Sequence, residues 1–402
     1  MRILFLSDNF PPEVNAPANR TFEHCKEWVK EGIEVTVVTC VPNFPKGKVF
    51  DGYRNKLVQK ETIEGITVIR VWSYITANEG FLKRILDYVS YATMAFWVSL
   101  FIRTDLIVAT SPQFFTAIAG SMAAFFKRKK WVMEVRDIWP ESIVAVGAMK
   151  KNSAIRFFEW VETRLYRSAH KIVVVTDAFK SNLIGKGVNP EKIFVFKNGA
   201  NLDQFTPGTK DASLVQKLGL QGKFVIAYIG THGLAHGLDF ILNCLSELEE
   251  ELKEVFFLFM GDGAEKRNLV NSANQKMLSN VAFIDSVPKQ EVLGYLRLMD
   301  VALVNLKKSD TFLTVIPSKI FEAAAVEKPI LLGLEGETKL LIEQYNAGLC
   351  FGPENRESFV AAVKSIYKDA DAYLRYKQGC RKLADDFDRK KIAKQMLDVL
   401  LD

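Results

Sequence analysis

The stretch PSKIFEAAAVEKPILL, residues 317–332, predicts the start of a helix, one helical turn that carries a carboxylate, and then a buried strand. Ser318 can cap that helix, and the free N–H groups at a helix N-terminus attract an anion such as a phosphate. Lys319 adds a positive charge at the same place. Glu322 follows one turn later, where a carboxylate can accept two hydrogen bonds from the vicinal diol of a ribose. A diphosphate next to a ribose describes a nucleotide-sugar, whereas the alternative is an ordinary capped amphipathic helix.

On either side of this stretch, short apolar runs rich in β-branched residues alternate with helical patterns. This alternation is typical of a parallel sheet covered by helices on both faces. In the first half we expect strands at 2–7, 34–39, 106–109, 131–135 and 171–175, and helices at 19–31, 82–102, 113–126, 154–168 and 178–186. In the second half we expect strands at 223–230, 255–260, 281–284, 301–306 and 329–332, and helices at 238–252, 264–278, 290–299 and 318–326.

The length of the chain, 402 residues, exceeds what one hydrophobic core usually serves, so two domains are expected. The segment 198–222 is rich in turn residues and is interpreted as a linker. The predicted fold class is therefore α/β, with two doubly wound Rossmann-like domains, residues 1–205 and 206–387, that face a central cleft. A further helix, at about 388–402, is expected to pack back onto the first domain.

The composition, with 49% hydrophobic and 25% charged residues, is that of a globular protein that can bury large cores. Five cysteines lie far apart with no C-x-x-C pair, which favours free thiols, a reducing cytoplasm and no structural zinc. The sequence MRILFLSD, residues 1–8, is too short and too soon acidic for a signal peptide, and it predicts a first strand.

The longest apolar run, residues 88–102, holds 15 residues, fewer than the roughly 20 that span a bilayer. Lys83, Arg84 and Arg103 flank it, and it is rich in aromatic residues. A buried helix fits this pattern, and so does a helix that partly meets an anionic membrane face. A second basic run, 127–130, directly precedes a predicted strand and so lies at the opposite edge from a cleft at the strand C-termini. Nucleic acid is disfavoured because no binding motif surrounds the net charge of +6.

Ligands of such sheets bind outside the carboxyl ends of the strands, so the loops there are the candidate sites. The loop Gly230-Thr231-His232-Gly233-Leu234-Ala235-His236-Gly237 follows a predicted strand and opens a helix. Its glycines allow close approach of the backbone to a phosphate, and either histidine could add a proton-dependent charge. The alternative is a glycine-rich turn with solvated histidines. Gly261-Asp262-Gly263 follows the next strand and is a weaker signal, because it is also common turn chemistry.

In the first half, residues 8–20 follow the first strand and contain no glycine. Their composition disfavours the G-x-G-x-x-G fingerprint of an NAD enzyme. The segment Glu134-Val135-Arg136-Asp137-Ile138-Trp139-Pro140-Glu141 gathers four ionisable groups and a tryptophan at another strand end. It predicts a polar cleft wall, or alternatively a salt-bridged loop.

In their order and spacing these segments resemble the GT-B glycosyltransferases of family four, over nearly the whole chain. The matching pieces are 10–13, Asn198-Gly199 with Phe205, 230–237, 261–263, and 317–319 with Glu322. Residues 136–142 are similar to a bacterial subgroup of O-antigen and capsule enzymes, which includes transferases of N-acetyl-L-fucosamine and related deoxy amino sugars.

By this resemblance Glu322 holds the donor ribose, as the second glutamate of an E-x7-E motif, and Ser318 and Lys319 contact the diphosphate. The implied catalytic residues are Arg136, Asp137 and Lys319. The implied donor-binding residues are Gly230, Thr231, His232, Gly233, His236, Gly263, Ser318, Lys319 and Glu322. The implied acceptor-side loop, in place of the usual Gly-Gly loop, holds Asn15, Ala16 and Arg20.

The sequence departs from the family pattern at four positions. The first glutamate of E-x7-E falls at Thr314, and the usual Arg and Lys of the phosphate loop fall at Thr231 and His236. The usual His of the first domain's wall falls at Arg136. The positive charge for the phosphates then has to come from Lys319, His236 and Arg136.

The resemblance implies a retaining glycosyltransferase that moves a sugar such as N-acetylfucosamine from a UDP-sugar to a lipid-linked saccharide in O-antigen or capsule biosynthesis. It implies no metal, no other cofactor and no nucleic acid, and a place on the inner face of the cytoplasmic membrane. Asp369-Ala370-Asp371 and Asp386-Phe387-Asp388 spell the D-x-D metal signature of the other glycosyltransferase fold. They lie in polar helical patterns and are interpreted as solvated. A UDP-sugar epimerase or hydrolase, and a non-catalytic nucleotide-sugar-binding protein, remain open as alternatives.

Overall fold

The structure is a computed structural model that describes residues 1–44, 46–76, 81–111, 114–141 and 152–402. The described chain divides into two compact units, Met1–Lys197 with Arg389–Asp402 (unit 1) and Asn198–Asp388 (unit 2). The expected cleft between two domains stays a prediction. Ser142, at the end of the segment that resembles the O-antigen subgroup, lies outside the described residues.

Unit 1 contains a sheet of eight strands in the order β3-β4-β2-β1-β5-β6-β7-β8. All neighbouring strands pair in parallel except β3 and β4, which are antiparallel. The strands, in chain order, are β1 (Arg2–Leu6), β2 (Glu34–Cys40), β3 (Val58–Ile63), β4 (Ile66–Val71), β5 (Leu106–Thr110), β6 (Lys130–Val135), β7 (Lys171–Val174) and β8 (Ile193–Val195).

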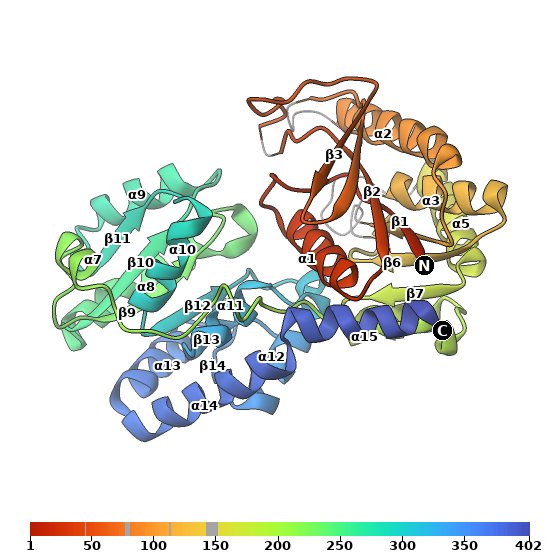
Figure 1. The fold of residues 1–402 in the computed structure, drawn as a ribbon. Helices are drawn as coiled ribbons and strands as arrows, with labels where there is room; N and C mark the ends of the chain where they lie inside the picture. Colours follow the sequence, from red (N-terminus) through yellow and green to blue (C-terminus); the bar gives the residue numbers. More distant parts are fainter. Residues whose placement is uncertain (45, 77–80, 112–113, 142–151) are drawn as a thin grey trace. The chain divides into compact units, whose positions relative to one another are not determined.

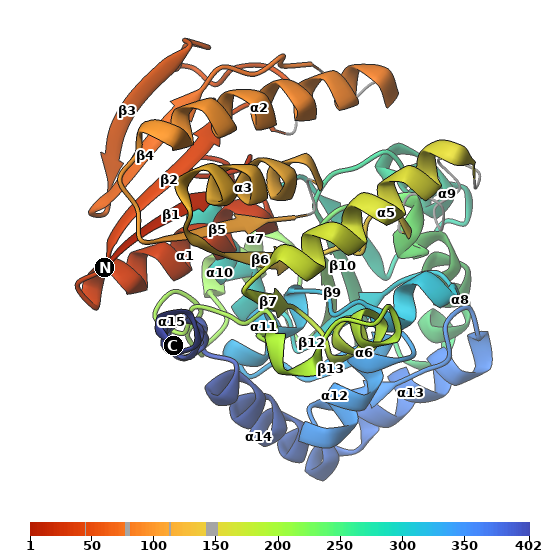
Figure 2. The same cartoon turned by 90° about the vertical axis from the view of Figure 1, so that its right-hand side faces the viewer.

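Helices cover both faces of this sheet (Figure 1). One face is covered by α2 (Phe81–Phe101), α3 (Phe114–Lys127), α5 (Ser153–Ser168) and α6 (Asp177–Gly185), which lie along the sheet in Figure 2. The other is covered by α1 (Ala16–Lys30) and α15 (Arg389–Leu401). Trp28 of α1 joins these two helices, because its Nε1 donates to the carbonyl of Ala393 at 2.8 Å. The 3-10 turn η1 (Pro190–Lys192) precedes β8.

Unit 2 contains a fully parallel sheet of six strands in the order β11-β10-β9-β12-β13-β14. Its strands are β9 (Phe224–Ile229), β10 (Val255–Met260), β11 (Val281–Ile284), β12 (Val301–Asn305), β13 (Ile330–Gly333) and β14 (Gly348–Cys350). Its helices are α7 (Ala212–Lys217), α8 (Leu238–Glu251), α9 (Lys266–Gln275), α10 (Lys289–Leu298), α11 (Lys319–Ala325), α12 (Glu337–Tyr345), α13 (Arg356–Lys368) and α14 (Ala370–Asp386), with 3-10 turns η2 (Leu234–His236) and η3 (Asp310–Thr314).

The two faces of the unit 2 sheet are closed by separate apolar clusters. One cluster packs α8, α9 and α13 against the sheet, through residues such as Leu245, Leu269 and Phe359. The other packs α10, α11, α12 and α14, through residues such as Phe321 and Leu383. The short helix α11 contributes five buried side chains, so the stretch that begins at Ser318 is fixed by the core beneath it.

The structure differs from the sequence predictions at two places in particular. The first sheet was expected to be parallel, but it carries the antiparallel hairpin β3–β4, whose turn places Glu64 and Gly65 at φ 49° and 80°. The segment 198–222, interpreted as a linker, contains α7, which Asp211 caps by accepting hydrogen bonds from the N–H groups of Ser213 and Leu214.

Helix α2 has one buried face and one exposed face. Tyr91 and Ala95 are buried against the sheet, whereas Trp97 and Phe101 are exposed. In the described part of the chain, no helix combines the length and the hydrophobicity needed to cross a membrane.

Candidate functional site

In unit 2, the loops after β9 and β10 lie against each other at the carboxyl edge of the sheet. A Cβ on Gly261 would lie 1.9 Å from the carbonyl oxygen of Gly230, and a Cβ on Gly263 would lie 2.4 Å from the carbonyl oxygen of His232. The backbone N–H of His232 donates to the carbonyl of Asp262 at 2.8 Å. Gly263, expected to bind the donor, therefore has a packing reason to be glycine, and the two loops form one backbone framework.

Lys319, the first residue of α11, points its amine into this framework. Its Nζ lies 3.8 Å from the centroid of the Tyr228 ring, a cation–π contact. A Cβ on Gly230 would lie 2.8 Å from the same Nζ, so the missing side chain of Gly230 makes room for it. Among the described residues, no carboxylate lies within ion-pair distance of this amine. Burial lowers the pKa of Lys319 to about 7, and Glu322 opposes that shift.

Glu322 lies one turn along α11 and is half-buried, while its neighbours Phe321 and Ala323 are buried in the core. The expected side-chain cap at Ser318 is wrong, because this residue has helical dihedral angles and its side chain makes no capping hydrogen bond. The physical reason is that an N-cap hydroxyl reaches the helix N–H groups from extended backbone, which Ser318 does not adopt. Thr314 ends η3, three residues before Pro317.

The two histidines of the 230–237 loop do not carry the charge that the sequence suggested. Burial lowers the pKa of both His232 and His236 to about 4, so both rings are neutral near pH 7. His232 is fully buried, and neither of its ring nitrogens has a hydrogen-bond partner. The Nδ1 of His236 lies 3.3 Å from the N–H of Gly233, which steadies the turn. The positive charges near this loop are those of Lys266 and Lys319, which both help to lower the pKa of His232.

Two residues that the sequence analysis did not single out support this loop. Tyr228, in β9, donates its hydroxyl to the carbonyl of Thr231 at 2.7 Å and offers its ring to Lys319. Asn305, the last residue of β12, donates through Nδ2 to the carbonyl of His236 at 2.8 Å. A polar residue at the end of an otherwise apolar strand was the available signal for Asn305. Nothing in the sequence separates Tyr228 from an ordinary core residue.

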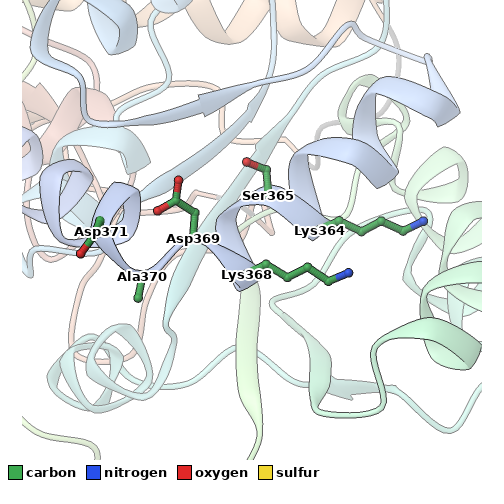
Figure 3. Close-up of a pocket in the computed structure, with 6 residues that line it drawn as sticks. All are labelled: Lys364, Ser365, Lys368, Asp369, Ala370 and Asp371. Carbon is green, nitrogen blue, oxygen red and sulfur yellow. The ribbon is translucent and has the colours of Figure 1, made fainter.

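The D-x-D sequence at 369–371 lines a shallow surface pocket rather than a strand end (Figure 3). Asp369 caps α14 by accepting a hydrogen bond from the N–H of Ala372 at 2.8 Å, and both aspartates are exposed. Lys364, on the same pocket, pairs with Glu251 at 2.6 Å. Asp386 is also exposed and accepts a hydrogen bond from the Tyr345 hydroxyl at 2.7 Å, whereas Asp388 is half-buried. The interpretation of 369–371 as solvated is confirmed.

In unit 1, the expected acceptor-side residues divide into a cap and a buried ion pair. Asn15 caps α1 by accepting a hydrogen bond from the N–H of Ala18 at 2.9 Å, and Ala16 begins the helix. Arg20 was named with the acceptor-side loop, although the predicted helix 19–31 includes it, and it lies in α1 with only 3% of its side chain exposed. It pairs with Glu134 at 2.9 Å and donates to the carbonyl of Phe196 at 2.9 Å. Arg20 therefore joins the helix to strands β6 and β8.

Arg136 follows β6 directly, and the structure leaves its guanidinium without a full set of partners. Its Nε and Nη1 are buried and make no hydrogen bond, while its backbone N–H donates to Ser111 Oγ at 3.3 Å. Burial lowers the pKa of Arg136 to about 10, and the charge of Glu134 opposes that shift. His24 lies near the same charges, and burial holds its pKa well below the usual range, so it adds no charge. Arg136 can donate hydrogen bonds to an anionic or hydroxylated ligand.

Asp137 is half-buried and begins the turn that leads to Trp139. The Trp139 ring stacks on Phe114 of α3, with centroids 4.8 Å apart, and meets Phe158 of α5 at 5.2 Å. These contacts fix the loop 136–140 to two helices of the covering layer.

The structure thus brings together two groups of the expected residues. Gly230, His232, His236 and Lys319 meet in unit 2, and Arg20, Glu134 and Arg136 meet in unit 1. Asp87 is a further titratable group that the sequence did not reveal. Burial raises its pKa to about 7, the charge of Asp8 adds to the shift, and both belong to unit 1.

Comparison with known families assigns the two halves of the chain. Residues 15–199 match the family described as glycosyl transferase 4-like domain, and residues 211–383 match glycosyl transferases group 1. The chain is 26% identical over 379 residues to the Escherichia coli (strain K12) protein that carries the name colanic acid biosynthesis glycosyl transferase WcaI. This alignment covers 90% of this chain and 91% of the E. coli protein. It is 29% identical over 241 residues to the glycosyltransferase WbjE of Pseudomonas aeruginosa, which covers 59% of this chain and 60% of that one.

Among solved structures, the chain is similar to Anabaena HepE, crystallised in complex with UDP and glucose. The TM-score is 0.73 at 17% sequence identity, and the match covers 100% of this chain and 99% of that one. At this level of sequence identity, the similarity supports a shared fold and no more.

Proposed function

Because its first half is a glycosyl transferase 4-like domain and its second half a group 1 domain, the chain belongs to the family-four glycosyltransferases, with the two-domain α/β GT-B fold, and from this premise we propose its donor and acceptor. The proposed donor is a UDP-sugar, and the proposed acceptor is a lipid-linked saccharide in the assembly of a bacterial surface polysaccharide. The proposed sugar is a deoxy N-acetylamino sugar such as N-acetylfucosamine.

One observation carries the donor proposal. The amine of Lys319 is enclosed beside Gly230 and over the ring of Tyr228, with no carboxylate at ion-pair distance among the described residues. Enclosing an ammonium without an anion is costly, and a diphosphate in the same place would supply the missing charge. Glu322, one turn further along α11, would accept hydrogen bonds from the ribose in this proposal.

The comparisons support the rest of the proposal by likeness. HepE holds UDP in a structure with the same fold, which favours uridine for this chain. WcaI is named for colanic acid biosynthesis, which favours a role in surface polysaccharide assembly.

We propose that transfer retains the anomeric configuration and needs neither a metal ion nor an enzyme nucleophile. The bond from the anomeric carbon to the β-phosphate oxygen breaks, the bond to the acceptor oxygen forms on the same face, and the departing phosphate oxygen takes the acceptor's proton. The protein's part is to stabilise the charge that develops on UDP, through Lys319 and the backbone N–H groups of the 230–237 loop. Arg136 and Asp137 are proposed to act on the acceptor side.

The test is calorimetric titration of UDP and GDP in the presence of EDTA. We expect UDP to bind without metal. Glu322→Ala should abolish the preference for UDP over inorganic diphosphate, because the ribose contact is lost. Lys319→Ala should weaken the binding of both UDP and inorganic diphosphate. Lys328→Ala is the matched control, because Lys328 is also a lysine whose pKa burial lowers, to about 8, but it lies beyond the other end of α11. If neither nucleotide binds, or if Lys328→Ala has the same effect as Lys319→Ala, the donor site is wrongly placed.

The alternative activities are distinguished by turnover. A UDP-sugar epimerase or hydrolase consumes its donor at full rate without an acceptor, whereas a transferase hydrolyses it slowly. A non-catalytic binding protein would bind UDP and turn over neither substrate.

A further inference from the structure

The covering layer of unit 1 presents apolar side chains to solvent at the C-terminal ends of α2 and α3. Phe101 and Phe125 are 86% and 78% exposed, and Phe126 is 63% exposed. The two helices are joined here, because the Phe96 and Phe126 rings lie 5.7 Å apart and Lys127 Nζ donates to the carbonyl of Leu100 at 2.9 Å. These exposed rings therefore belong to one continuous surface.

Helix α5 extends this surface toward the candidate site. Met122 of α3 and Trp160 of α5 line the same hollow, and the Trp160 ring stacks on Phe157 with centroids 6.0 Å apart. Phe157 in turn contacts Phe158, which contacts Trp139 of the loop beside Arg136. Figure 2 shows α2, α3 and α5 on the same side of the sheet. We call this set the aromatic surface: Trp97, Phe101, Met122, Phe125, Phe126, Phe157 and Trp160.

The charged side chains that flank the aromatic surface are predominantly basic. Arg164 lies over the Trp160 ring at 5.1 Å, and Arg167 lines the same hollow. An adjoining hollow, which shares Ser168 with the first, is lined by basic side chains from the ends of α3 and the starts of three strands. The exposed basic residues at these places are Arg103, Arg128, Lys129, Lys130, Arg164 and Arg167.

The acids of the same elements offset only part of this charge, and Glu159 of α5 is half-buried. Glu162 of α5 is buried and pairs with Lys186, and Asp105, which precedes β5, pairs with Arg2. Two copies of the chain related by a twofold axis would bring like charges face to face, which disfavours a homodimer through this surface. Tryptophan and phenylalanine with arginine and lysine around them fit the boundary between lipid headgroups and acyl chains.

We propose that the aromatic surface docks the protein onto an anionic lipid membrane, with the rings entering the interface and the flanking arginines and lysines contacting lipid phosphates. The inference rests on the proposed lipid-linked acceptor, whose saccharide would reach the Arg136 loop along α5. In this proposal the membrane contact does not include Lys83 and Arg84. These two residues lie at the other end of α2, about 27 Å from Phe101 at 1.5 Å per residue.

The experiment is co-sedimentation of the full chain with vesicles of phosphatidylglycerol and phosphatidylcholine, and with vesicles of phosphatidylcholine alone. We expect binding to the mixed vesicles that weakens with salt. The double variant Phe101→Ser/Phe125→Ser should lower the vesicle affinity roughly tenfold or more, because less apolar area enters the interface. Lys129→Gln/Arg167→Gln should lower it roughly tenfold and reduce the salt dependence.

Two control variants should sediment as the native protein does. Leu340→Ser removes an apolar side chain that is 67% exposed on α12 of unit 2, and Lys83→Gln/Arg84→Gln removes the charges at the start of α2. UDP affinity is measured for every variant, so that loss of folding is separated from loss of docking.

Three results would overturn the inference. The first is that the native protein fails to bind mixed vesicles while it still binds UDP. The second is that the Lys83→Gln/Arg84→Gln variant alone no longer binds the vesicles. The third is that light scattering finds a self-associated form of the native protein that is absent in Phe101→Ser/Phe125→Ser. Vesicle binding without UDP binding would instead contradict the proposed donor site and leave the docking surface in place.

Discussion

At the scale of single residues, Lys319 is the clearest case of a group whose environment suits a ligand. Its amine is enclosed by a ring and a glycine loop, and burial lowers its pKa to about 7. In the free protein the amine is therefore charged below pH 7 and neutral above it. A diphosphate binds the charged form and raises the pKa back toward its ordinary value, because an adjacent anion favours the ammonium.

This coupling predicts a pH-dependent affinity. Above pH 7 the free protein must take up a proton to bind UDP, so the affinity should fall by roughly tenfold for each pH unit until the pKa of the complex is reached. Calorimetry between pH 7 and 9, in buffers of different ionisation enthalpy, measures both the slope and the proton uptake. Lys319→Met should bind more weakly at pH 7 and lose the slope; a slope that survives in this variant would assign the titration to another group.

Arg136 and Glu134 are neighbours for which opposite stability changes are expected. Arg136 has two buried donors without partners, so Arg136→Met should leave the free energy of unfolding unchanged or raise it. The same variant should lower acceptor-dependent turnover roughly tenfold or more, with UDP affinity unaltered. Glu134→Gln leaves Arg20 buried beside a neutral partner and should lower the free energy of unfolding by about 3 kcal/mol. Chemical denaturation and steady-state kinetics measure the pair, and a large loss of stability in Arg136→Met would make that residue structural.

At the scale of elements, the loops after β9 and β10 form one framework because glycine allows them to touch. A Cβ at Gly261 would lie 1.9 Å from a backbone oxygen, and both Gly261 and Gly263 have positive φ, 143° and 156°. Gly261→Ala and Gly263→Ala should each destabilise unit 2 by about 1–3 kcal/mol and weaken UDP binding.

Gly294→Ala is the matched control for these two variants. Gly294 lies inside α10, where a Cβ would have nothing within 4 Å, so alanine should stabilise the helix by about 1 kcal/mol. Thermal unfolding with and without UDP measures all three variants. Equal behaviour of the three would mean that the contact between the loops does not position the ligand.

The alternation of apolar runs predicted most of these elements to within a residue or two, because buried parallel strands are short, apolar and bounded by turns. The hairpin β3–β4 was not predicted, since β3 alternates exposed and half-buried residues and lies at the sheet edge. The short edge strands β8 and β14 were not predicted either. The loop of residues 64–65 held a usable signal, a glycine at a two-residue turn between strands.

The candidate site was predictable only where it follows from strand order. Loops after neighbouring parallel strands must meet at one edge, and Gly230, Gly261 and Lys319 do. The pairing of Arg20 with Glu134 joins residues that no sequence pattern connects. The neutral state of His236 depends on burial, which the composition of a loop does not reveal.

At the scale of the whole molecule, unit 1 depends on a helix that follows unit 2 in the sequence. Met396 of α15 is fully buried in the cluster that contains Trp28, so Met396→Ala should lower the free energy of unfolding by about 2–5 kcal/mol. UDP affinity of the folded protein should not change, because the proposed donor residues all lie in unit 2. Lys394→Ala, whose side chain is 63% exposed, should alter stability by less than about 0.5 kcal/mol. Scanning calorimetry and UDP titration test both, and loss of UDP binding by folded Met396→Ala would mean that the units are coupled.

The return of α15 also bears on the order in which the protein can be completed on the ribosome. Residues 1–197 emerge first, but the flank that Met396, Leu397 and Leu400 cover stays open while the 191 residues of unit 2 are made. Unit 2 holds all of its own strands in one continuous stretch and can finish earlier, although it comes second. At about 5–20 residues per second, the nascent first sheet waits roughly 10–40 s with an apolar flank exposed. How long that flank needs shielding from aggregation is therefore set by translation speed.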